Sequence, residues 1–200
     1  MRSGASLGPI DSFASGESCR TAQASLMCDG RSENSGPMAK RGVRQGPVQI
    51  CRAQLTDAEA IAGCLSAAFA RHRDEYTAGA YADTVLNSDG VRRRLQEMCL
   101  FVAISDGEIV GTIGCSANGS EGHLRGMAVL PDWQGTGVAL ALLHSAEAEL
   151  KKSGCGCVSL DTTAPLIQAV RFYTKNGYSA SGRVADFFGM PLYEYRKLLL

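Results

Sequence analysis

Glycines, an amide side chain and a small residue are spaced over residues 134–139 in a way that could bind a phosphate group. The apolar stretch Met127–Leu130 and a Pro-Asp turn lead into Gln-Gly-Thr-Gly-Val-Ala, and a long amphipathic stretch follows. Gly135 and Gly137 let the backbone turn sharply and approach a ligand closely. A helix starting there presents unpaired N–H groups and its positive dipole end to an anion. The sequence therefore predicts a phosphate cradle between a strand and a helix.

Two other phosphate-binding loops and a plain turn are alternatives for this segment. A Walker A loop ends in Gly-Lys-Ser or Gly-Lys-Thr, and neither occurs. A Rossmann loop needs its glycines directly after the strand and a third glycine where Leu140 stands, although Asp161 ends the next predicted strand near the place of a ribose-binding acid. A strand-to-helix turn without any ligand is the structural alternative.

A second segment, Ala169-Val-Arg-Phe-Tyr-Thr-Lys-Asn-Gly-Tyr178, lies downstream. Together the two segments resemble the GCN5-related N-acetyltransferase (GNAT) family. Its cofactor loop reads Arg or Gln, two residues, Gly, one residue, then Gly or Ala, as in Gln134-x-x-Gly137-x-Ala139. Its closing helix has Ala followed four residues later by Tyr and then a Gly-aromatic turn. The resemblance covers residues 48–200 and is most specific over 123–178.

The resemblance implies an α/β (α+β) fold of the GNAT type: a central mixed, mostly antiparallel sheet, splayed after its fourth strand, with helices on both faces. It implies transfer of an acetyl group from acetyl-CoA, as co-substrate, to a primary amine of a small molecule or peptide, by direct attack in a ternary complex. The implied cofactor-binding residues are Met127, Ala128, Val129, Gln134, Gly135, Thr136, Gly137, Val138, Ala139 and Phe172.

The chemistry also needs groups that move protons, because a neutral amine must attack and a thiolate must leave. By the resemblance, Tyr173 donates a proton to the departing sulfur. His123, with Glu121 as the other candidate, stands at the start of the fourth strand, where the family keeps a base. The structural alternatives are a solvent-facing histidine on a strand and a tyrosine that only packs.

The sequence departs from the family at Leu166, where an asparagine usually contacts the cofactor. The hydroxyls of Thr162 or Thr163 are candidates to replace that contact. The acceptor is expected between residues 71–97 and 183–193, whose charges are also typical of an ordinary solvated face. A non-catalytic acetyl-CoA-binding sensor or interaction module is the alternative function.

Composition excludes several other classes of protein. The formal net charge of the 200 residues is zero, which gives no bulk attraction to nucleic acid or an anionic membrane. No apolar run approaches the length of a membrane span. Eight cysteines are scattered among apolar neighbours, and Cys155-Gly-Cys157 has no second pair, so we expect no metal site and a reducing, cytoplasmic environment. The chain is expected to be a monomer or homodimer.

The elements that position these residues can be read from periodicity and turn signals. Residues 1–46 are rich in Gly, Ser, Arg and Pro and predict a disordered extension; a transit peptide is disfavoured by four acids. Residues 47–200 form the folded domain. Its predicted strands are Val48–Ala53, Cys99–Ser105, Glu108–Ser116, His123–Leu130, Val158–Asp161, Tyr178–Phe188 and Pro191–Leu199. Its predicted helices are one with a Thr56–Glu59 capping box, a short one capped by Ser88, Thr136–Lys152 and Ile167–Lys175.

Overall fold

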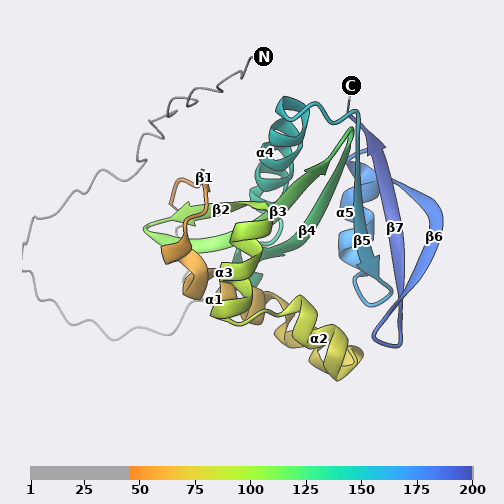
Figure 1. Cartoon of the computed structure of the whole chain (residues 1–200). Coiled ribbons are helices and arrows are strands. Elements are labelled where there is room, and N and C mark those ends of the chain that lie inside the picture. The colour runs from red at the N-terminus through yellow and green to blue at the C-terminus, as the bar shows by residue number, and fades with distance from the viewer. Residues whose placement is uncertain (1–45, 200) are drawn as a thin grey trace, which may run out of the picture. The chain divides into compact units, whose positions relative to one another are not determined.

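The computed structural model describes residues 46–199 (Figure 1). The predicted disordered extension lies outside these residues, apart from Gly46. The strands are β1 Gln49–Arg52, β2 Cys99–Ser105, β3 Glu108–Asn118, β4 Glu121–Val129, β5 Cys157–Thr163, β6 Ser179–Phe187 and β7 Met190–Leu198. The helices are α1 Ala58–Phe69, α2 Ala78–Thr84, α3 Ser88–Glu97, α4 Val138–Lys152 and α5 Ile167–Lys175, with short 3-10 turns at Leu55–Asp57, Ala70–Glu75 and Pro131–Trp133.

The strands form one mixed sheet in the order β1-β2-β3-β4-β5-β7-β6. Every neighbouring pair is antiparallel except β4 and β5, which are parallel. That parallel pair is joined through α4, as a parallel crossover requires. The predicted mixed, mostly antiparallel sheet is confirmed.

The two parallel strands separate halfway along their length (Figure 1). Their pairing runs from Glu121 with Cys157 to Leu124 with Leu160 and goes no further. Beyond that point β5 stays paired with β7 as far as Thr163. Within residues 46–199 the second half of β4 therefore has a strand partner only on its β3 side. The predicted splay after the fourth strand is confirmed.

A bulge in β4 accompanies this separation. Gly126 and Met127 both lie opposite Ile113, because the register with β3 shifts between Thr112 and Gly114. Gly126 has φ +65°, a conformation that side chains rarely adopt. A bulge of this kind bends a strand and increases its twist, which turns the end of β4 away from β5.

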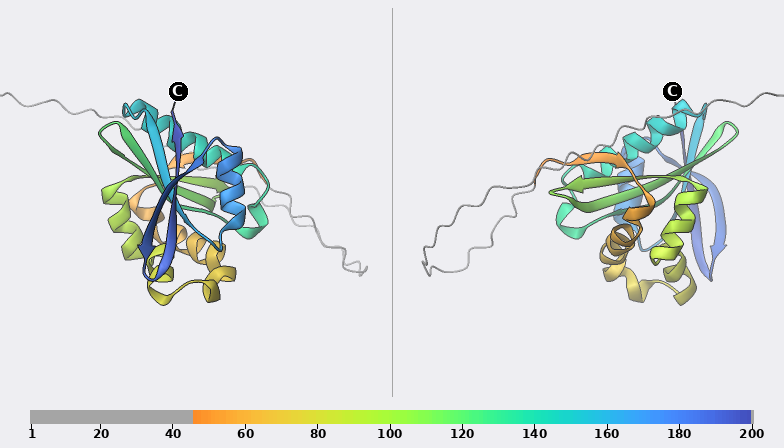
Figure 2. Two further views of the ribbon diagram at one scale, coloured as in Figure 1. Left: turned by 90° about the vertical axis from the view of Figure 1, so that its right-hand side faces the viewer. Right: turned by 60° about the vertical axis from the view of Figure 1, so that its left-hand side comes forward.

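Helices cover both faces of the sheet, as expected (Figure 2). One face packs its core against α4 and α5, through residues such as Leu142, Leu143 and Tyr173. The other packs against α1 and α3, through Ile61, Leu65 and Val91. The gap between β4 and β5 thus opens between two packed helical layers.

Most predicted elements are confirmed to within a few residues, and three details were wrong. The Thr56–Glu59 capping box is absent: the backbone N–H of Gln54 donates to the Asp57 carboxylate at 2.8 Å, and α1 begins at Ala58. Asn87, rather than Ser88, caps α3 through a bond from the Gly90 N–H at 2.9 Å. Helix α2 was not predicted, because its small residues show no clear apolar stripe.

A buried ion pair fixes the aromatic cluster beneath the gap. Lys197 Nζ lies 2.8 Å from both carboxylate oxygens of Glu147, whose side chain is 9% exposed. The Tyr178 hydroxyl donates to the same carboxylate at 2.9 Å, and its ring meets the Tyr173 ring edge-on at 5.6 Å between centroids. The pair therefore holds Tyr178, and through it Tyr173, in one position.

We expect Lys197→Met to lower the free energy of unfolding by roughly 3 kcal/mol, because it leaves the Glu147 carboxylate buried without its cation. Adding Glu147→Gln removes that stranded charge and keeps an acceptor for Tyr178, so the double variant should be more stable than the single one. Denaturant unfolding of the three proteins measures this. A double variant that is no more stable than Lys197→Met would show that the buried charge is not the cause.

Candidate active site

A groove of about 410 Å³ runs along the separated end of β4. Its walls come from β4, from the loop before α4, from the start of α5 and from the end of α1. Of the residues predicted to bind the cofactor, those that line it are Met127, Ala128, Val129, Gln134, Gly135, Ala139 and Phe172. Thr136 and Gly137 of the loop and Val138, the first residue of α4, do not line it.

The loop before α4 has the geometry of an anion cradle. Gly137 is the N-cap of α4 with φ +93°, and the first backbone bond of the helix runs from the Ala141 N–H to the Gly137 carbonyl at 3.0 Å. The N–H groups of Val138, Ala139 and Leu140 therefore precede the helix's own hydrogen-bond ladder. They lie at the positive end of the helix dipole, so the loop fits a pyrophosphate.

Side chains hold this loop against the end of β4. Gln134 Nε2 donates to the Val129 carbonyl at 3.1 Å, and the Thr136 hydroxyl donates to the Trp133 carbonyl at 2.6 Å. Gln134 therefore holds the loop against β4 and uses its amide N–H within the protein.

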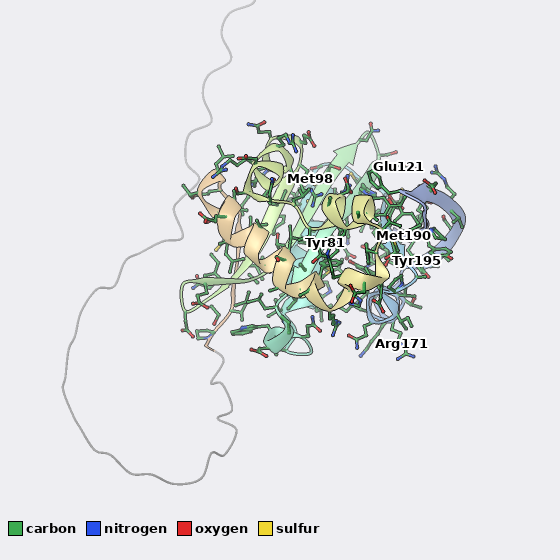
Figure 3. The ribbon with its side chains drawn as sticks, turned by 90° about the horizontal axis from the view of Figure 1, so that it is seen from below. Tyr81, Met98, Glu121, Arg171, Met190 and Tyr195 are labelled. Carbon is green, nitrogen blue, oxygen red and sulfur yellow. The ribbon has the colours of Figure 1, made fainter. Side chains whose placement is uncertain are left out.

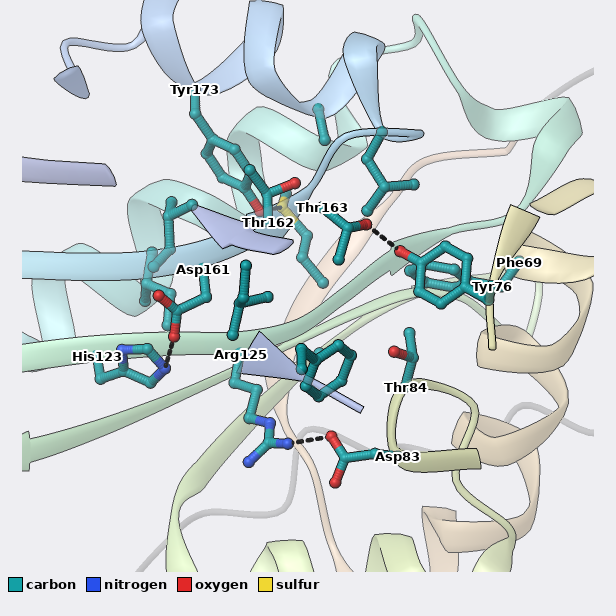
Figure 4. Close-up of a pocket in the computed structure, with 18 of the residues that line it drawn as sticks. Phe69, Tyr76, Asp83, Thr84, His123, Arg125, Asp161, Thr162, Thr163 and Tyr173 are labelled. Carbon is teal, nitrogen blue, oxygen red and sulfur yellow. Dashed lines mark hydrogen bonds and ion pairs between the residues drawn. The ribbon is translucent and has the colours of Figure 1, made fainter. Parts of the chain in front are cut away.

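A second cavity, of about 260 Å³, opens on the other side of the gap (Figure 4). It shares Phe69, Met127, Leu166, Ala169 and Tyr173 with the groove, so the two spaces meet there. Strands β4 and β5 supply part of its other walls, and the segments in which the acceptor was expected supply the rest: Tyr76, Asp83, Thr84 and Arg94 from the first, and Phe187 and Leu192 from the second.

The β6–β7 hairpin closes this second cavity against α2. The Thr77 hydroxyl donates to the Phe188 carbonyl at 2.8 Å, and the Thr77 N–H lies 3.4 Å from the sulfur of Met190. Figure 3, seen from below, shows Tyr81 of α2 and Met190 on this side of the molecule. The cavity is thus enclosed by two elements that are distant in sequence.

Tyr173 lies at the junction of the two spaces. Its side chain is buried, and its hydroxyl donates to the sulfur of Met127 at 3.1 Å. Burial raises the pKa of this hydroxyl above its ordinary value, because the phenolate would lose its hydration. Tyr173 is therefore protonated at neutral pH.

His123 faces the second cavity from β4 (Figure 4). Its Nδ1 lies 3.1 Å from the Ser159 hydroxyl, which itself donates to the Gly122 carbonyl at 3.3 Å. With the hydroxyl proton on the Gly122 carbonyl, Ser159 can accept from Nδ1–H, and this tautomer leaves the lone pair on Nε2. That Nε2 lies 3.7 Å from Asp161 Oδ2.

The electrostatics around His123 favour its neutral form. Burial lowers its pKa below the ordinary value; Arg125 acts in the same direction, while Asp161 and Glu194 act against it. Burial also raises the pKa of Asp161. A neutral imidazole beside a carboxylate can accept a proton and then be stabilised as the cation.

The other candidate base, Glu121, lies apart from this cluster. Its carboxylate pairs with Arg196 at 2.5 Å, and it does not line the second cavity. Leu166, which stands where the family usually has an asparagine, lines both the groove and the second cavity. Of the two threonines, Thr163 shares a hydrogen bond with Tyr76 at 2.6 Å, while the buried Thr162 hydroxyl has no partner within residues 46–199.

Sequence reasoning did not name five polar residues of the second cavity or its edge: Asp83, Thr84, Arg94, Arg125 and Ser159. Asp83 and Arg94 lie on helices whose contact with β4 no local pattern reveals. Ser159 could have been found, because it occupies the parallel partner position of His123.

In the described part of the chain no group of three or more His, Cys, Asp or Glu side chains could hold a metal ion. No helix within residues 46–199 is long and apolar enough to span a membrane.

Comparison with known proteins agrees with this architecture. The chain matches the acetyltransferase (GNAT) family over residues 55–178. It is 35% identical over 106 residues to an aminoglycoside N(6')-acetyltransferase type 1 from Stenotrophomonas maltophilia, covering 48% of this chain and 69% of that protein. It is 33% identical over 81 residues to an uncharacterized N-acetyltransferase from Methanocaldococcus jannaschii, covering 40% and 52%.

Solved structures share the fold at low identity. Ribosomal-protein-S18-alanine N-acetyltransferase from Escherichia coli superposes with a TM-score of 0.64 at 18% identity, covering 76% of this chain and 94% of that one. PaiA N-acetyltransferase from Thermoplasma acidophilum, solved with coenzyme A, gives 0.64 at 17% identity, covering 76% and 99%. The chain belongs to the GNAT acetyltransferase family, and its fold is the GNAT fold.

We expect Gly137→Val to weaken acetyl-CoA binding by at least tenfold. Space is not the obstacle, since an added Cβ would meet nothing within 4 Å; the obstacle is φ +93°, which a β-branched residue cannot adopt without moving the cradle. Gly154→Val is the matched control, because Gly154 has φ +83° and equal space at the far end of α4. Calorimetric titration that finds unchanged affinity in a folded Gly137→Val protein would contradict the assignment.

Proposed function

We propose that this protein is an N-acetyltransferase that moves the acetyl group of acetyl-CoA to a primary amine of a small molecule or the end of a peptide. The observation that carries the proposal is the meeting of the groove and the second cavity at Met127 and Tyr173. A thioester entering through the groove and an amine entering through the cavity would meet there. Direct transfer in a ternary complex needs this arrangement.

The cofactor would be held mainly by backbone. The N–H groups at the start of α4 would bind its pyrophosphate, and the free edge of β4 from Met127 to Val129 would bind its pantetheine arm. A main-chain N–H at the same edge would donate to the thioester carbonyl oxygen as negative charge develops there. Apolar walls such as Phe172 exclude water, which strengthens these bonds.

The proton transfers are assigned to His123 and Tyr173. His123 Nε2 takes a proton from the ammonium form of the acceptor, directly or through one water, and leaves a neutral amine. The amine nitrogen then bonds to the carbonyl carbon, the carbon–sulfur bond breaks, and the nitrogen releases its extra proton to water, which leaves a neutral amide. The leaving thiolate takes the proton of Tyr173, and exchange with solvent restores both residues. The products are the acetylated amine and CoA.

The size of the second cavity favours a small acceptor. At about 260 Å³ it is near the lower end of ligand pockets, which hold roughly 300–1,000 Å³. It can enclose a small amine or the end of a longer chain. The aminoglycoside acetyltransferase among the relatives agrees with an amine acceptor; it does not decide which amine.

The experiment is acetyl-CoA turnover by the purified protein with a panel of amines, followed by thiol release. The panel contains amino acids, their amides, diamines, polyamines, aminoglycosides and short peptides. Acetylation of at least one class well above acetyl-CoA hydrolysis is expected. Tight binding of acetyl-CoA with no acetylation of any amine would instead support a non-catalytic sensor.

We expect Tyr173→Phe to lower kcat by roughly a hundredfold and to change acetyl-CoA affinity much less, because the ring survives while the proton donor is lost. Tyr195→Phe is the control, since Tyr195 packs against the same core without lining either space. Steady-state kinetics measures kcat, and calorimetry measures acetyl-CoA affinity, for both variants. An unchanged kcat in Tyr173→Phe would remove this residue from the mechanism.

The pH dependence of kcat/KM should contain a rising limb from His123. A base must be neutral to act, and burial lowers the pKa of His123, so this limb lies below the ordinary histidine value of about 6.5. His123→Ala should abolish that limb, whereas His144→Ala, on the exposed side of α4, should keep it. If the limb survives in His123→Ala, Glu121 or a water chain becomes the candidate base.

A further inference from the structure

The second cavity contains a buried cation that the proposed proton transfers do not use. Arg94 of α3 lines the cavity and is 9% exposed. Burial lowers the pKa of its guanidinium to about 10, so the group remains charged at neutral pH. Arginines are almost never this buried unless they are paired.

Arg94 has little compensation from the protein itself. The one hydrogen bond of its guanidinium within residues 46–199 goes from Nη2 to the Asp83 carbonyl at 3.4 Å, and no ion pair there includes it. The carboxylate of Asp83 pairs instead with Arg125 (Figure 4). Arg125 repels the Arg94 charge, while Asp83 and Glu97 attract it from beyond ion-pair distance. A guanidinium offers five N–H donors, so most of its capacity remains unused.

The position of Arg94 is close to the expected reaction centre. Its Nη1 lies 2.6 Å from where a Cβ on Gly126 would stand, so the guanidinium rests on the β4 bulge. Met127, the next residue, lies where the groove and the cavity meet. The absence of a side chain at Gly126 is what lets the cation approach the strand. An anion bound to Arg94 would therefore lie only a few bonds from an amine that attacks beside Met127.

We propose that Arg94 binds a carboxylate of the acceptor, and that the acceptor is a small amino acid whose amine and carboxylate are separated by a few bonds. The inference rests on the proposed acetyl transfer and names the substrate class of that site. A planar guanidinium binds a carboxylate through two parallel hydrogen bonds, which fixes the orientation of the acceptor as well as its affinity. His123, which precedes Gly126 in β4, and Asp161 of β5 lie where the proposed mechanism removes the proton of the amine.

A purely structural role for Arg94 makes a different prediction. It would affect stability and lower activity on all amines alike. A carboxylate-binding role affects the choice between an acid and its uncharged analogue. The ratio of kcat/KM for an amino acid to that for its amide therefore separates the two roles.

The test uses the full chain and matched pairs: glycine, alanine, serine, β-alanine and γ-aminobutyrate, each with its carboxamide. Wild-type protein should prefer the acid of at least one pair by roughly ten- to a hundredfold, the effect expected of charge-assisted hydrogen bonds. Arg94→Met should bring that ratio close to one. Arg94→Lys, which keeps the charge without the planar donors, should give an intermediate ratio. Arg92→Met is the control, because Arg92 is on α3 and pairs with Asp89 at the surface.

Each outcome decides a separate claim. Acetylation of amines without preference for the acid, or the same preference in Arg94→Met, would overturn the carboxylate inference and leave the proposed function standing. If no amine is acetylated, the proposed function fails, and the inference is judged by calorimetric titration of the same pairs into protein saturated with CoA. Binding of an acid that is lost in Arg94→Met, but kept in Arg92→Met, supports it; equal binding of acid and amide contradicts it. Melting temperatures of all variants identify any that are unfolded. The ratio of kcat/KM for the acid to that for the amide in the wild-type protein tests the inference even if every variant fails to fold.

Discussion

The separation of β4 from β5 after Leu124 and Leu160 is the constraint on which the site depends. Buried backbone N–H and C=O groups need hydrogen-bond partners, and here β4 loses its partner in the middle of a packed domain. The bulge at Gly126 turns β4 aside, while β7 keeps β5 in the sheet. What results is a strand edge with unused donors, accessible from the groove on one side and from the second cavity on the other. Such an edge suits a ligand that is bound through main-chain groups.

Burial has opposite and complementary effects on the two residues assigned to proton transfer. It raises the pKa of Tyr173, which keeps that hydroxyl protonated, and it lowers the pKa of His123, which keeps that imidazole neutral. In each case the charged form is the one that loses hydration. These two protonation states are the ones that the proposed proton transfers require. Arg94 differs, since its charge survives burial and no carboxylate of the described residues forms an ion pair with it.

The sequence could predict those parts of the site that depend on local backbone geometry. The cradle around Gly135 and Gly137 follows from glycine placement, and the strand and helix elements follow from periodicity. The roles expected of Met127–Val129 and Tyr173 came from the resemblance to the GNAT family. Residues brought together across distant elements could not be predicted in the same way. Helix α2 has small residues and no apolar stripe, and Arg94 carries no signal of burial, because its contact with Gly126 depends on how α3 packs against β4.

A crystal structure of the protein with acetyl-CoA tests the central claim most directly. The account predicts the pyrophosphate at the N–H groups of Val138–Leu140 and the pantetheine arm along Met127–Val129. It also predicts the thioester sulfur within hydrogen-bonding distance of the Tyr173 hydroxyl, with the acetyl group facing the cavity of His123 and Arg94. Acetyl-CoA bound elsewhere, or bound in the groove with its thioester directed away from that cavity, would contradict it.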